Sequence, residues 1–379
     1  MINPKAFIEY LDSVGFNFYT GVPDSVLEPF CSYLDFAKTR REHIIASNEG
    51  NAVALAAGNY LATEKLSIVY MQNSGFGNAL NPLTSLTNEE SYGIPMLVFI
   101  GWRGAPGVTD EPQHMLMGGI LEQLLRLLNI RYVILSMDFE KAAQQIDEMK
   151  YIALSKMIPA AILVGKDTFE KTTDHKRKSN YSLSRELVVK TLLNKFCEDI
   201  IVSTTGKCSR EVFEFLDLEK REHNNIFYCV GSMGHASSIA LGIAKNYPNR
   251  RVVIFDGDGS LIMHMGALAT IGCSKLKNLI HIVINNGCHE SVGGQKTLGF
   301  EINISSIAKQ CGYRRAIRID SFQKLSDLSE DIFSVDGSNL IEILVNNNSR
   351  NDLLRPNIPL AKLKINFIHK LSESRNRIY

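Results

Sequence analysis

Two short polar segments in the second half of the chain have the residue types best suited to chemistry. Gly257-Asp258-Gly259 and Asn285-Asn286 each follow an apolar run, at 251–255 and 279–284. The amphipathic stretch between them predicts strand, turn, helix and strand, and a connection of this length requires a crossover between parallel neighbouring strands. We therefore expect Asp258 and Asn286 side by side at the carboxyl ends of adjacent strands, where open α/β sheets bind ligands.

The ligand chemistry of this pair is that of a hard cation. One carboxylate, one amide oxygen and nearby backbone carbonyls suit Mg²⁺, which usually keeps phosphate oxygens in its coordination shell. The glycines on either side of Asp258 let the backbone approach a diphosphate closely. The segment therefore predicts a site for a metal ion and a diphosphate.

The elements that must position these residues occur twice. When the sequence is shifted by 184 residues, landmarks coincide without a gap: Gly50 with Gly234, Ala56 with Ala240, Gly58 with Gly242, Val69 with Val253, and Gly75 with Gly259. Each half runs helix, strand, Gly turn, helix and strand, which is typical of two copies of one α/β domain. Unrelated α/β domains would share some glycines without keeping the helix and both strands in one register.

The domain boundaries follow from composition. A chain of 379 residues favours two domains, and a polar, basic stretch at 172–180 predicts a linker. We expect one domain at 1–172, a linker at 173–182 and a second domain at 183–379, with a short helix near 362–371. Helices at 51–61 and 236–244 are rich in small residues and expose little polarity, which favours an oligomer.

Composition argues against several classes of protein. A net charge of +1 supplies no field for nucleic acid. The seven cysteines form no CxxC pair, which is typical of reduced thiols in a cytoplasmic protein. The first residues lack signal-peptide features, and no apolar run reaches the roughly 20 residues of a membrane helix. We expect a cytoplasmic protein with no nucleic-acid or membrane partner.

With this spacing and in a duplicated chain, Gly257-Asp258-Gly259 and Asn285-Asn286 resemble the thiamine-diphosphate-binding motif of the thiamine-diphosphate-dependent decarboxylase family. The resemblance implies two similar doubly wound parallel-sheet domains, pyrimidine-binding at 1–172 and diphosphate-binding at 183–379, without a third central domain. It implies Mg²⁺ bound by the Asp258 and Asn286 side chains and the Cys288 carbonyl. An ordinary Asp-Gly turn followed by an Asn-rich loop would give the same residues without a site.

Further coenzyme contacts are implied by the same resemblance. Gly257, Gly259 and Ser260 would meet the diphosphate, since free N–H groups at the start of a helix favour anions. Gly231-Ser232-Met233 would grip the middle of the coenzyme, with Met233 as an apolar wedge, and His289 belongs to the same set. Met233 could otherwise serve ordinary core packing.

Glu49 lies where this family has the glutamate that activates the coenzyme through its aminopyrimidine. The family pairs the pyrimidine domain of one subunit with the diphosphate domain of another, so the resemblance implies a homo-oligomer with its active site at the subunit interface. On local sequence alone, Glu49 could be a first-turn glutamate that stabilises a helix N-terminus by about 0.3–1 kcal/mol.

Longer segments resemble the phosphonopyruvate decarboxylases within this family: 20–25, 48–52, 72–78, 101–104 and 286–295. The reaction so implied is decarboxylation of 3-phosphonopyruvate to phosphonoacetaldehyde and carbon dioxide, a step of phosphonate biosynthesis. Sulfopyruvate decarboxylases share much of the pattern, usually as two half-length chains, so the fused chain favours phosphonopyruvate.

Asp24 and His114 lie where related decarboxylases have groups for proton transfer. Asp24 could instead cap a helix beginning at Val26, and His114 could be a loop histidine bonded to backbone. A dianionic phosphonate requires cationic or amide donors. Arg103 and Asn73 are the tentative substrate residues, and other eligible donors are Lys207, Arg210, His289 and Lys296; the segment Thr204-Thr205-Gly206-Lys207 could instead touch the diphosphate.

Two alternatives stay open at this point. The same coenzyme also serves other 2-keto acid decarboxylases and carboligases. A different class, a Mg²⁺-dependent nucleotide-binding module, would use Asp256 and Asp258 as its carboxylates.

Overall fold

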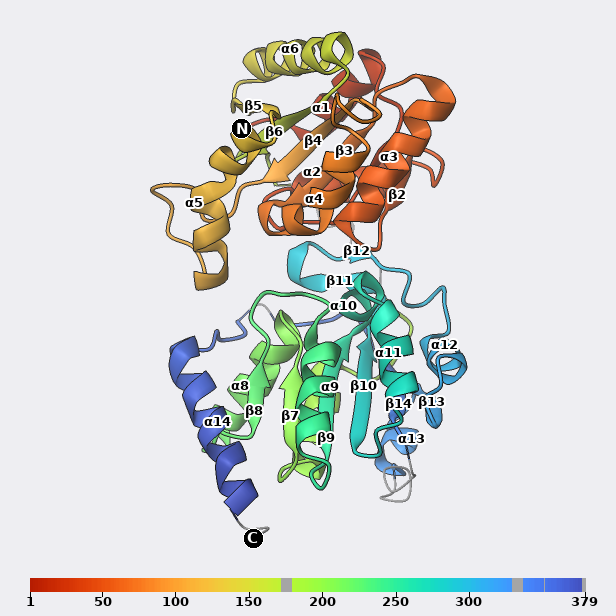
Figure 1. Cartoon of the computed structure of the whole chain (residues 1–379), viewed down its shortest axis with the longest axis vertical. Coiled ribbons are helices and arrows are strands. Elements are labelled where there is room, and N and C mark those ends of the chain that lie inside the picture. Colours follow the sequence, from red (N-terminus) through yellow and green to blue (C-terminus); the bar gives the residue numbers. More distant parts are fainter. Residues whose placement is uncertain (172–178, 329–336, 351, 377–379) are drawn as a thin grey trace. The chain divides into compact units, whose positions relative to one another are not determined.

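The structure is a computed structural model that describes residues 1–171, 179–328, 337–350 and 352–376. They form two compact α/β units (Figure 1). The first comprises Met1–Lys176 with the short segment Ser291–Lys296, and the second comprises Arg177–Glu290 with Thr297–Tyr379. Of the predicted linker at 173–182, residues 173–178 lie outside the described part of the chain, so the predicted domain boundaries stay predictions.

The first unit is built on a six-stranded parallel sheet in the order β2-β1-β3-β4-β6-β5. Its strands are β1 (Tyr19–Gly21), β2 (His43–Ile45), β3 (Ile68–Gln72), β4 (Met96–Gly101), β5 (Arg131–Ile134) and β6 (Pro159–Val164). Every residue of the central strand β4 is buried, which is expected of parallel strands covered on both faces.

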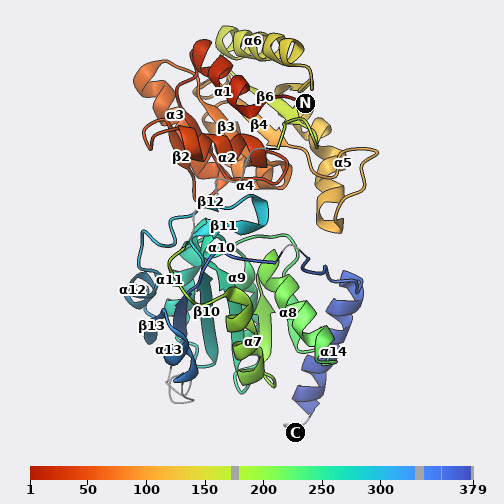
Figure 2. The same cartoon turned by 180° about the vertical axis from the view of Figure 1, so that it is seen from behind.

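Helices cover both faces of this sheet. They are α1 (Pro4–Ser13), α2 (Glu28–Ala37), α3 (Glu49–Thr63), α4 (Phe76–Ser85), α5 (Pro112–Leu127) and α6 (Phe139–Lys156), with the 3₁₀ turn η1 (Asn73–Gly75). One apolar cluster joins α1, α2 and α6 to alternate strand residues, and another joins α3, α4 and α5 to the residues between them. Figure 1 shows α3 and α4 on one face, and Figure 2 shows α1 and α2 on the other.

The second unit repeats this plan. Its sheet order is β13-β14-β10-β9-β7-β8, all parallel. The strands are β7 (Ile200–Ser203), β8 (Ile226–Tyr228), β9 (Val252–Gly257), β10 (Leu279–Asn285), β13 (Arg315–Ile319) and β14 (Asn339–Leu344). The short strands β11 (Cys288–His289) and β12 (Gln295–Lys296) follow β10 along the chain.

The helices of the second unit also cover both faces of its sheet. They are α7 (Arg185–Lys195), α8 (Lys207–Leu218), α9 (Ala236–Asn246), α10 (Asp258–Met263), α11 (Gly266–Ser274), α12 (Ile304–Gln310), α13 (Phe322–Ser326) and α14 (Leu360–Asn376), with the 3₁₀ turn η2 (Glu290–Val292). Helix α14 is longer than the predicted short helix at 362–371, since it continues at both ends.

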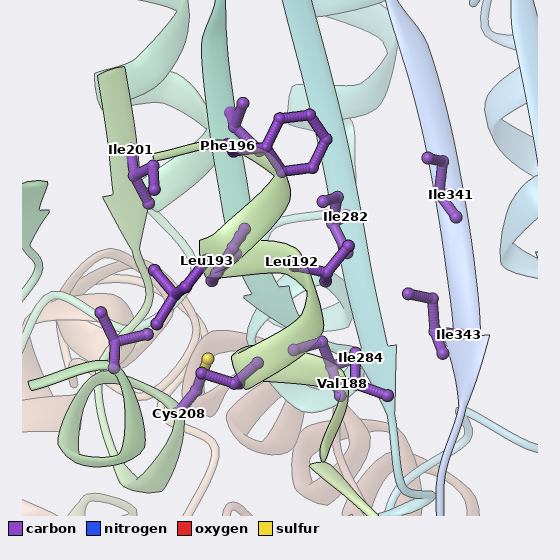
Figure 3. Packing of buried hydrophobic residues seen from close by; sticks show 14 of the residues in the cluster. Val188, Leu192, Leu193, Phe196, Ile201, Cys208, Ile282, Ile284, Ile341 and Ile343 are labelled. Atoms are coloured by element: carbon purple, nitrogen blue, oxygen red, sulfur yellow. The ribbon is translucent and has the colours of Figure 1, made fainter. Parts of the chain in front are cut away.

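The packing of α7 shows why this face is stable. Val188, Leu192 and Phe196 lie on one side of the helix, against isoleucines of β10 and β14 (Figure 3). Their spacing of four residues places them on one face of the helix. Ser184 caps the helix by accepting a hydrogen bond from Leu187 N at 3.2 Å.

The two sheets have one topology. Read from the edge at β2 or β8, strands β2-β1-β3-β4-β6-β5 correspond in chain order to β8-β7-β9-β10-β14-β13. Strand β3 begins at Ile68 and β9 at Val252, a separation of 184 residues. The predicted fold of two similar doubly wound parallel-sheet domains is therefore confirmed. Among the described residues, no helix combines the length and apolar character needed to cross a membrane.

Candidate functional site

The predicted coenzyme segments of the second unit meet at the carboxyl ends of β7, β8 and β9. The Ser260 hydroxyl shares a 2.9 Å hydrogen bond with Thr204 Oγ1 and accepts one of 3.1 Å from Gly234 N. The Thr205 hydroxyl oxygen accepts a third, of 3.2 Å, from Gly231 N. The loops after three strands are thus joined directly at the edge where parallel sheets bind ligands.

Asp258 is the first residue of α10 and is buried. Its Oδ1 accepts a hydrogen bond from Asn286 N at 3.3 Å, and its Oδ2 accepts one from the Thr297 hydroxyl. Burial raises the pKa of Asp258 to about 6, and the groups that oppose this rise are hydroxyl and backbone donors rather than cations. A buried carboxylate with neutral partners fits a position that a metal ion occupies.

Asn286 lies beside Asp258, as predicted from the parallel pairing of β9 and β10. Its Oδ1 accepts from Cys288 N at 3.2 Å, and its Nδ2 donates to Glu290 Oε2 at 2.9 Å. Burial raises the pKa of the Cys288 thiol to about 12, so the thiol stays neutral and only the backbone carbonyl suits Mg²⁺. In the described ranges, no group of three His, Cys, Asp or Glu side chains could hold a metal ion. The predicted ligand set would not form such a group, because only one of its three ligands is a carboxylate.

Glycines shape the space around Asp258. A Cβ added at Gly259 would lie 3.0 Å from His289 Cε1, and one added at Gly299 would overlap the Asp258 carboxylate. At Gly257 an added Cβ would meet no atom within 4 Å. The site is therefore closed on the His289 side and open beside Gly257, where a ligand has room. Burial also lowers the pKa of His289 to about 4, so this ring is neutral at physiological pH.

The loop predicted to grip the coenzyme is sharply bent. Gly231, Ser232 and Gly234 have φ angles of +70°, +45° and +86°. A non-glycine residue such as Ser232 in this region costs roughly 1–3 kcal/mol and is often found at functional sites. The half-buried Met233 lies within the bend, and a Cβ at Gly234 would collide with the His264 ring. This shape fits a loop that presents one apolar side chain and its own carbonyls.

In the first unit, Glu49 is the first residue of α3 and only 5% exposed. Its Oε2 accepts a hydrogen bond from Asn78 Nδ2 at 2.8 Å, and a Cβ on Gly75 would overlap its Oε1. Burial raises the pKa of Glu49, against the hydrogen bond from Asn78. A glutamate that only stabilises a helix terminus can do so from solvent, whereas this carboxyl group is held in a fitted, buried position.

Asp24 has both roles that the sequence left open. Its Oδ1 accepts from Val26 N at 2.8 Å and from Leu27 N at 3.1 Å, so it caps the turn before α2, which begins at Glu28 rather than at Val26. Its Oδ2 is buried and has no hydrogen-bond partner among the described residues. Burial raises the pKa of Asp24, while the two N–H groups and nearby Arg103 oppose the rise. One oxygen is therefore structural and the other is available to a proton.

Arg103 and Asn73 are engaged with the protein itself. Arg103 donates to both carboxylate oxygens of Asp110, at 2.6 and 2.5 Å, and to Ser25 Oγ at 2.7 Å. The Asn73 amide bonds the backbone of Arg103 twice, at 2.8 and 3.2 Å. The ion pair with Asp110 neutralises much of the charge that a phosphonate would meet at Arg103.

His114 is the third residue of α5, so the alternative of a loop histidine is wrong, and its catalytic role stays a prediction. Pro112 begins this helix, because its fixed φ suits the first helical position. His114 Nδ1 lies 3.5 Å from Gln72 Nε2. Partial burial lowers the pKa of His114, and Arg103 lowers it further, so the neutral ring can accept a proton near pH 7.

All five of these side chains belong to one edge of the first sheet. Asp24 follows β1, Glu49 follows β2, Asn73 follows β3, and Arg103 follows β4, with His114 at the start of the next helix. Parallel strands end on the same edge, which is why residues spread over 91 positions of the chain gather there. The second unit gathers Asp258, Asn286 and the 231–234 loop at the equivalent edge of its own sheet.

The bonds of Asp256 count against the nucleotide-binding alternative. Asp256 Oδ2 lies 3.2 Å from His281 Nε2, and Asp256 Oδ1 accepts from Gly257 N at 2.9 Å. His281 Nδ1 in turn lies 3.1 Å from the Tyr313 hydroxyl. Both oxygens of Asp256 are thus occupied in a buried network, whereas that alternative requires Asp256 as a metal ligand.

Other cationic candidates for the substrate are also engaged. Arg210 donates to the backbone carbonyls of Leu353 and Leu354, and Lys207 Nζ lies 3.9 Å from Glu290 Oε1. Sequence reasoning missed the residues that hold the site residues in place: Asn78, Asp110, Thr297 and Glu290. Asn78 and Glu290 stand inside the segments that carried the resemblance, so they were open to inspection. Asp110 and Thr297 lie in irregular segments without a sequence pattern.

Comparison with known proteins gives two family matches. Residues 4–124 match the N-terminal thiamine-pyrophosphate-binding domain of thiamine pyrophosphate enzymes, and residues 204–343 match their C-terminal thiamine-pyrophosphate-binding domain. Thiamine pyrophosphate is another name for thiamine diphosphate. The two matched regions contain the two sets of residues described above.

Three relatives match nearly the whole chain. A phosphonopyruvate decarboxylase from Streptomyces viridochromogenes is 33% identical, over 97% of this chain and 94% of its own length. Another, from Streptomyces hygroscopicus, is 32% identical over 94% and 91%. A sulfopyruvate decarboxylase from Methanosarcina acetivorans is 28% identical over 95% of both chains. Because this last relative is also one long chain, fusion of the two halves does not distinguish the two activities.

Proposed function

Because the chain belongs to the thiamine pyrophosphate enzymes, in the family of the phosphonopyruvate decarboxylases, we propose that it decarboxylates 3-phosphonopyruvate to phosphonoacetaldehyde and carbon dioxide. The observation that carries this substrate is the similarity, along nearly the full chain, to two phosphonopyruvate decarboxylases. Both sets of site residues lie within the matched regions, which supports the same coenzyme chemistry.

Asp258, Asn286 and the Cys288 carbonyl would bind Mg²⁺. The neutral partners of the buried Asp258 carboxylate support this role, since a cation there would stabilise its charged form. The open space beside Gly257 supports a diphosphate at the same strand end, and the bend at 231–234 supports a grip on the rest of the coenzyme. Thiamine diphosphate, when bound, supplies the electron sink that accepts the bonding pair as carbon dioxide leaves a 2-keto acid.

Glu49 would hold and deliver a proton at the coenzyme's aminopyrimidine. Asn78 fixes Oε2, and Oε1 lies against Gly75, in space that a side chain there would fill. A carboxyl group whose pKa is raised by burial exchanges a proton more readily near neutral pH than an exposed glutamate does. This role differs from that of Asp258, whose charged carboxylate would bind the metal ion.

Asp24 and His114 would handle the protons of the substrate. The unpartnered Oδ2 of Asp24 and the neutral ring of His114 support proton transfer at these two atoms. Arg103 would bind the phosphonate only in competition with its ion pair to Asp110. We therefore propose that its main role is to orient Ser25 and the segment that follows β4. Asn73 holds the backbone of Arg103 and supports the same segment.

We also propose that the active enzyme is a homo-oligomer whose active site lies between subunits. We propose that it is located in the cytoplasm. Helix α3 leaves Leu55 and Leu61 exposed, with the small residues Ala54 and Gly58 on the same side. An apolar face on a helix of small residues supports close packing against a second copy. Analytical ultracentrifugation of the purified protein with and without coenzyme measures the oligomeric state directly; a monomer with full activity would contradict this part.

The test of the reaction uses purified protein with Mg²⁺ and thiamine diphosphate. We expect ³¹P NMR to show 3-phosphonopyruvate converted to phosphonoacetaldehyde, with one carbon dioxide released per product. Omission of the coenzyme or chelation of the metal should stop turnover. The proposal fails if phosphonopyruvate is untouched under conditions in which the protein binds its coenzyme.

A second candidate is decarboxylation of sulfopyruvate. It is favoured by the full-length similarity to the Methanosarcina acetivorans protein. Phosphonate and sulfonate differ by one charge at neutral pH, so the two substrates would be separated by the cations that meet this group. Measured kcat/KM values for the two substrates decide between them: a higher value for sulfopyruvate would replace the first candidate with the second.

A further inference from the structure

A buried cluster of charged side chains lies next to the proposed metal site. Arg185 donates through Nε and Nη2 to the two carboxylate oxygens of Glu211, at 2.8 Å each, and through Nη1 to Glu290 Oε2 at 2.5 Å. The side chains of these three residues are 9%, 3% and 10% exposed. Lys207 lies near the other oxygen of Glu290, at 3.9 Å. Arg185, Glu211 and Glu290 are not among the residues proposed to bind the metal or the coenzyme.

An arginine at position 185 is expected to lower the stability of the fold, for two reasons. It is the first residue of α7, where the positive end of the helix dipole disfavours a cation by about 0.3–1 kcal/mol. Burial of an arginine and two carboxylates adds a desolvation cost that their attraction only partly offsets. A buried ion pair is therefore weak evidence for stability, and conformational specificity is the better-attested benefit of such groups.

The specific geometry here concerns the side-chain amide of Asn286. Glu290 Oε2 accepts from Asn286 Nδ2 at 2.9 Å and also from Arg185 Nη1. The Arg185 guanidinium can only donate hydrogen bonds, so Glu290 Oε2 is an acceptor, and it fixes which end of the Asn286 amide faces it. Nδ2 must face Glu290, and Oδ1 must face the opposite side, where it accepts from Cys288 N. Oδ1 is the atom that would bind the metal.

We propose that Arg185 and Glu290 are positioning residues for the metal site: Arg185 holds the Glu290 carboxyl group in place, and Glu290 holds the Asn286 amide with Oδ1 toward the cation. This inference rests on the proposed function, because it takes Asp258, Asn286 and the Cys288 carbonyl as the metal ligands. Glu211 anchors Arg185 from α8, so the loop that follows β10 is tied to two helices of its own unit.

The sharpest variant is Glu290→Gln, which keeps the size of the side chain. A glutamine amide can donate as well as accept, so it no longer dictates the orientation of Asn286. We expect the Kd for Mn²⁺, measured by electron paramagnetic resonance with thiamine diphosphate present, to rise about 10–100-fold, the usual effect of losing a group that orients a metal ligand. At saturating metal, kcat should fall much less than the affinity does.

Arg185→Met is the second variant, and Arg251→Met is its matched control. Arg251 belongs to the same unit and pairs with Asp199 at 2.6 Å, but it precedes β9 and so lies at the opposite edge of the sheet from Asn286. Arg185→Met should weaken Mn²⁺ binding at least as much as Glu290→Gln. Arg251→Met should leave the Kd for Mn²⁺ unchanged, whatever it does to the melting temperature.

Three outcomes are distinguishable. If the unaltered protein binds no Mn²⁺, the proposed function itself fails. If the unaltered protein binds Mn²⁺ and both Glu290→Gln and Arg185→Met bind it equally well, the positioning role is wrong while the proposed function stands. If Arg251→Met weakens Mn²⁺ binding as much as Glu290→Gln does, the effect is one of general stability, and the positioning role is again overturned. Circular dichroism of each variant without metal checks that it is folded.

Discussion

The strand ends of the two units differ although their sheets share one topology. At the end of β9, the second unit has Asp258, whereas the matched position of the first unit, 184 residues earlier, is Ser74. At the start of the small-residue helix α3, the first unit has Glu49, whereas the matched position of the second unit is Met233. Each copy therefore has one buried carboxyl group at a place where the other has none. The common fold supplies the edge of the sheet, and single residues supply the chemistry.

The surroundings of Glu49 and Asp258 are alike, and they differ from those of the buried Glu211. Glu49 is bonded by the Asn78 amide, and Asp258 by the Thr297 hydroxyl and backbone N–H groups. Burial raises the pKa of both. Glu211, by contrast, lies against the Arg185 guanidinium. Buried acids with neutral partners cost stability, so their presence at matched edges of two sheets favours function over structure.

The largest expected effect comes from Glu49→Gln. If Glu49 transfers a proton while Asp258 binds metal, this variant should lose about 10²–10⁴-fold in kcat, the usual contribution of a positioned acid or base. It should keep its affinity for thiamine diphosphate and Mg²⁺, measured by tryptophan fluorescence and calorimetry. Glu186→Gln is the control, because Glu186 is the first-turn glutamate of α7 and pairs with Arg350. Equal losses in the two variants would make Glu49 an ordinary helix glutamate.

Asp258→Asn should give the opposite pattern. The neutral amide removes the only carboxylate of the proposed metal set, so the Kd for Mg²⁺ should rise by more than about 100-fold, beyond the range typical of residues outside the ligand set. Activity should be recovered in part at high metal concentration, which no concentration of metal can do for Glu49→Gln. Calorimetric titration with Mg²⁺ measures the change. Asp320→Asn, at an exposed acid after β13, is the control. Unchanged metal affinity in Asp258→Asn would move the metal site elsewhere.

Thr297→Val tests the neutral partner of Asp258. The valine keeps the shape of the side chain but cannot donate to Oδ2, so the ionised carboxylate loses one hydrogen bond, of about 1.5–3 kcal/mol for a charged acceptor. A metal ion compensates for part of this loss, so we expect a Kd for Mg²⁺ roughly 10-fold higher. Thr191→Val, at a hydroxyl that bonds the backbone within α7, should not change the Kd. A tighter Kd in Thr297→Val would show that Thr297 competes with the metal.

The sequence was sufficient to predict the two sheets and one residue of each pair of contacting side chains at the site, but not its partner. Apolar runs ending in polar residues predicted β9 and β10 as parallel neighbours, and the glycine register predicted a second sheet of the same kind. Partners in irregular segments were not predictable in the same way. Asp110 lies seven residues after Arg103 in a segment without periodicity, and Thr297 lies 39 residues after Asp258. Their contacts depend on how loops return to a strand end, which no local pattern records.

The smallest expected effect is a pH-dependent difference in stability at Glu49, measured without coenzyme. The pKa of Glu49 is raised in the folded protein, so folding favours the protonated form. The stability that the protonated form contributes is present below the unfolded pKa of about 4.5 and is lost as pH rises through the folded pKa.

Glu49→Gln removes this titration. The variant and the unaltered protein should therefore melt alike at pH 4.5, and the variant should melt higher at pH 8, with each kcal/mol worth about 2–4 °C. A constant difference across this range would mean that Glu49 is not strained by its burial, and the likeness between its surroundings and those of Asp258 would then be one of geometry alone.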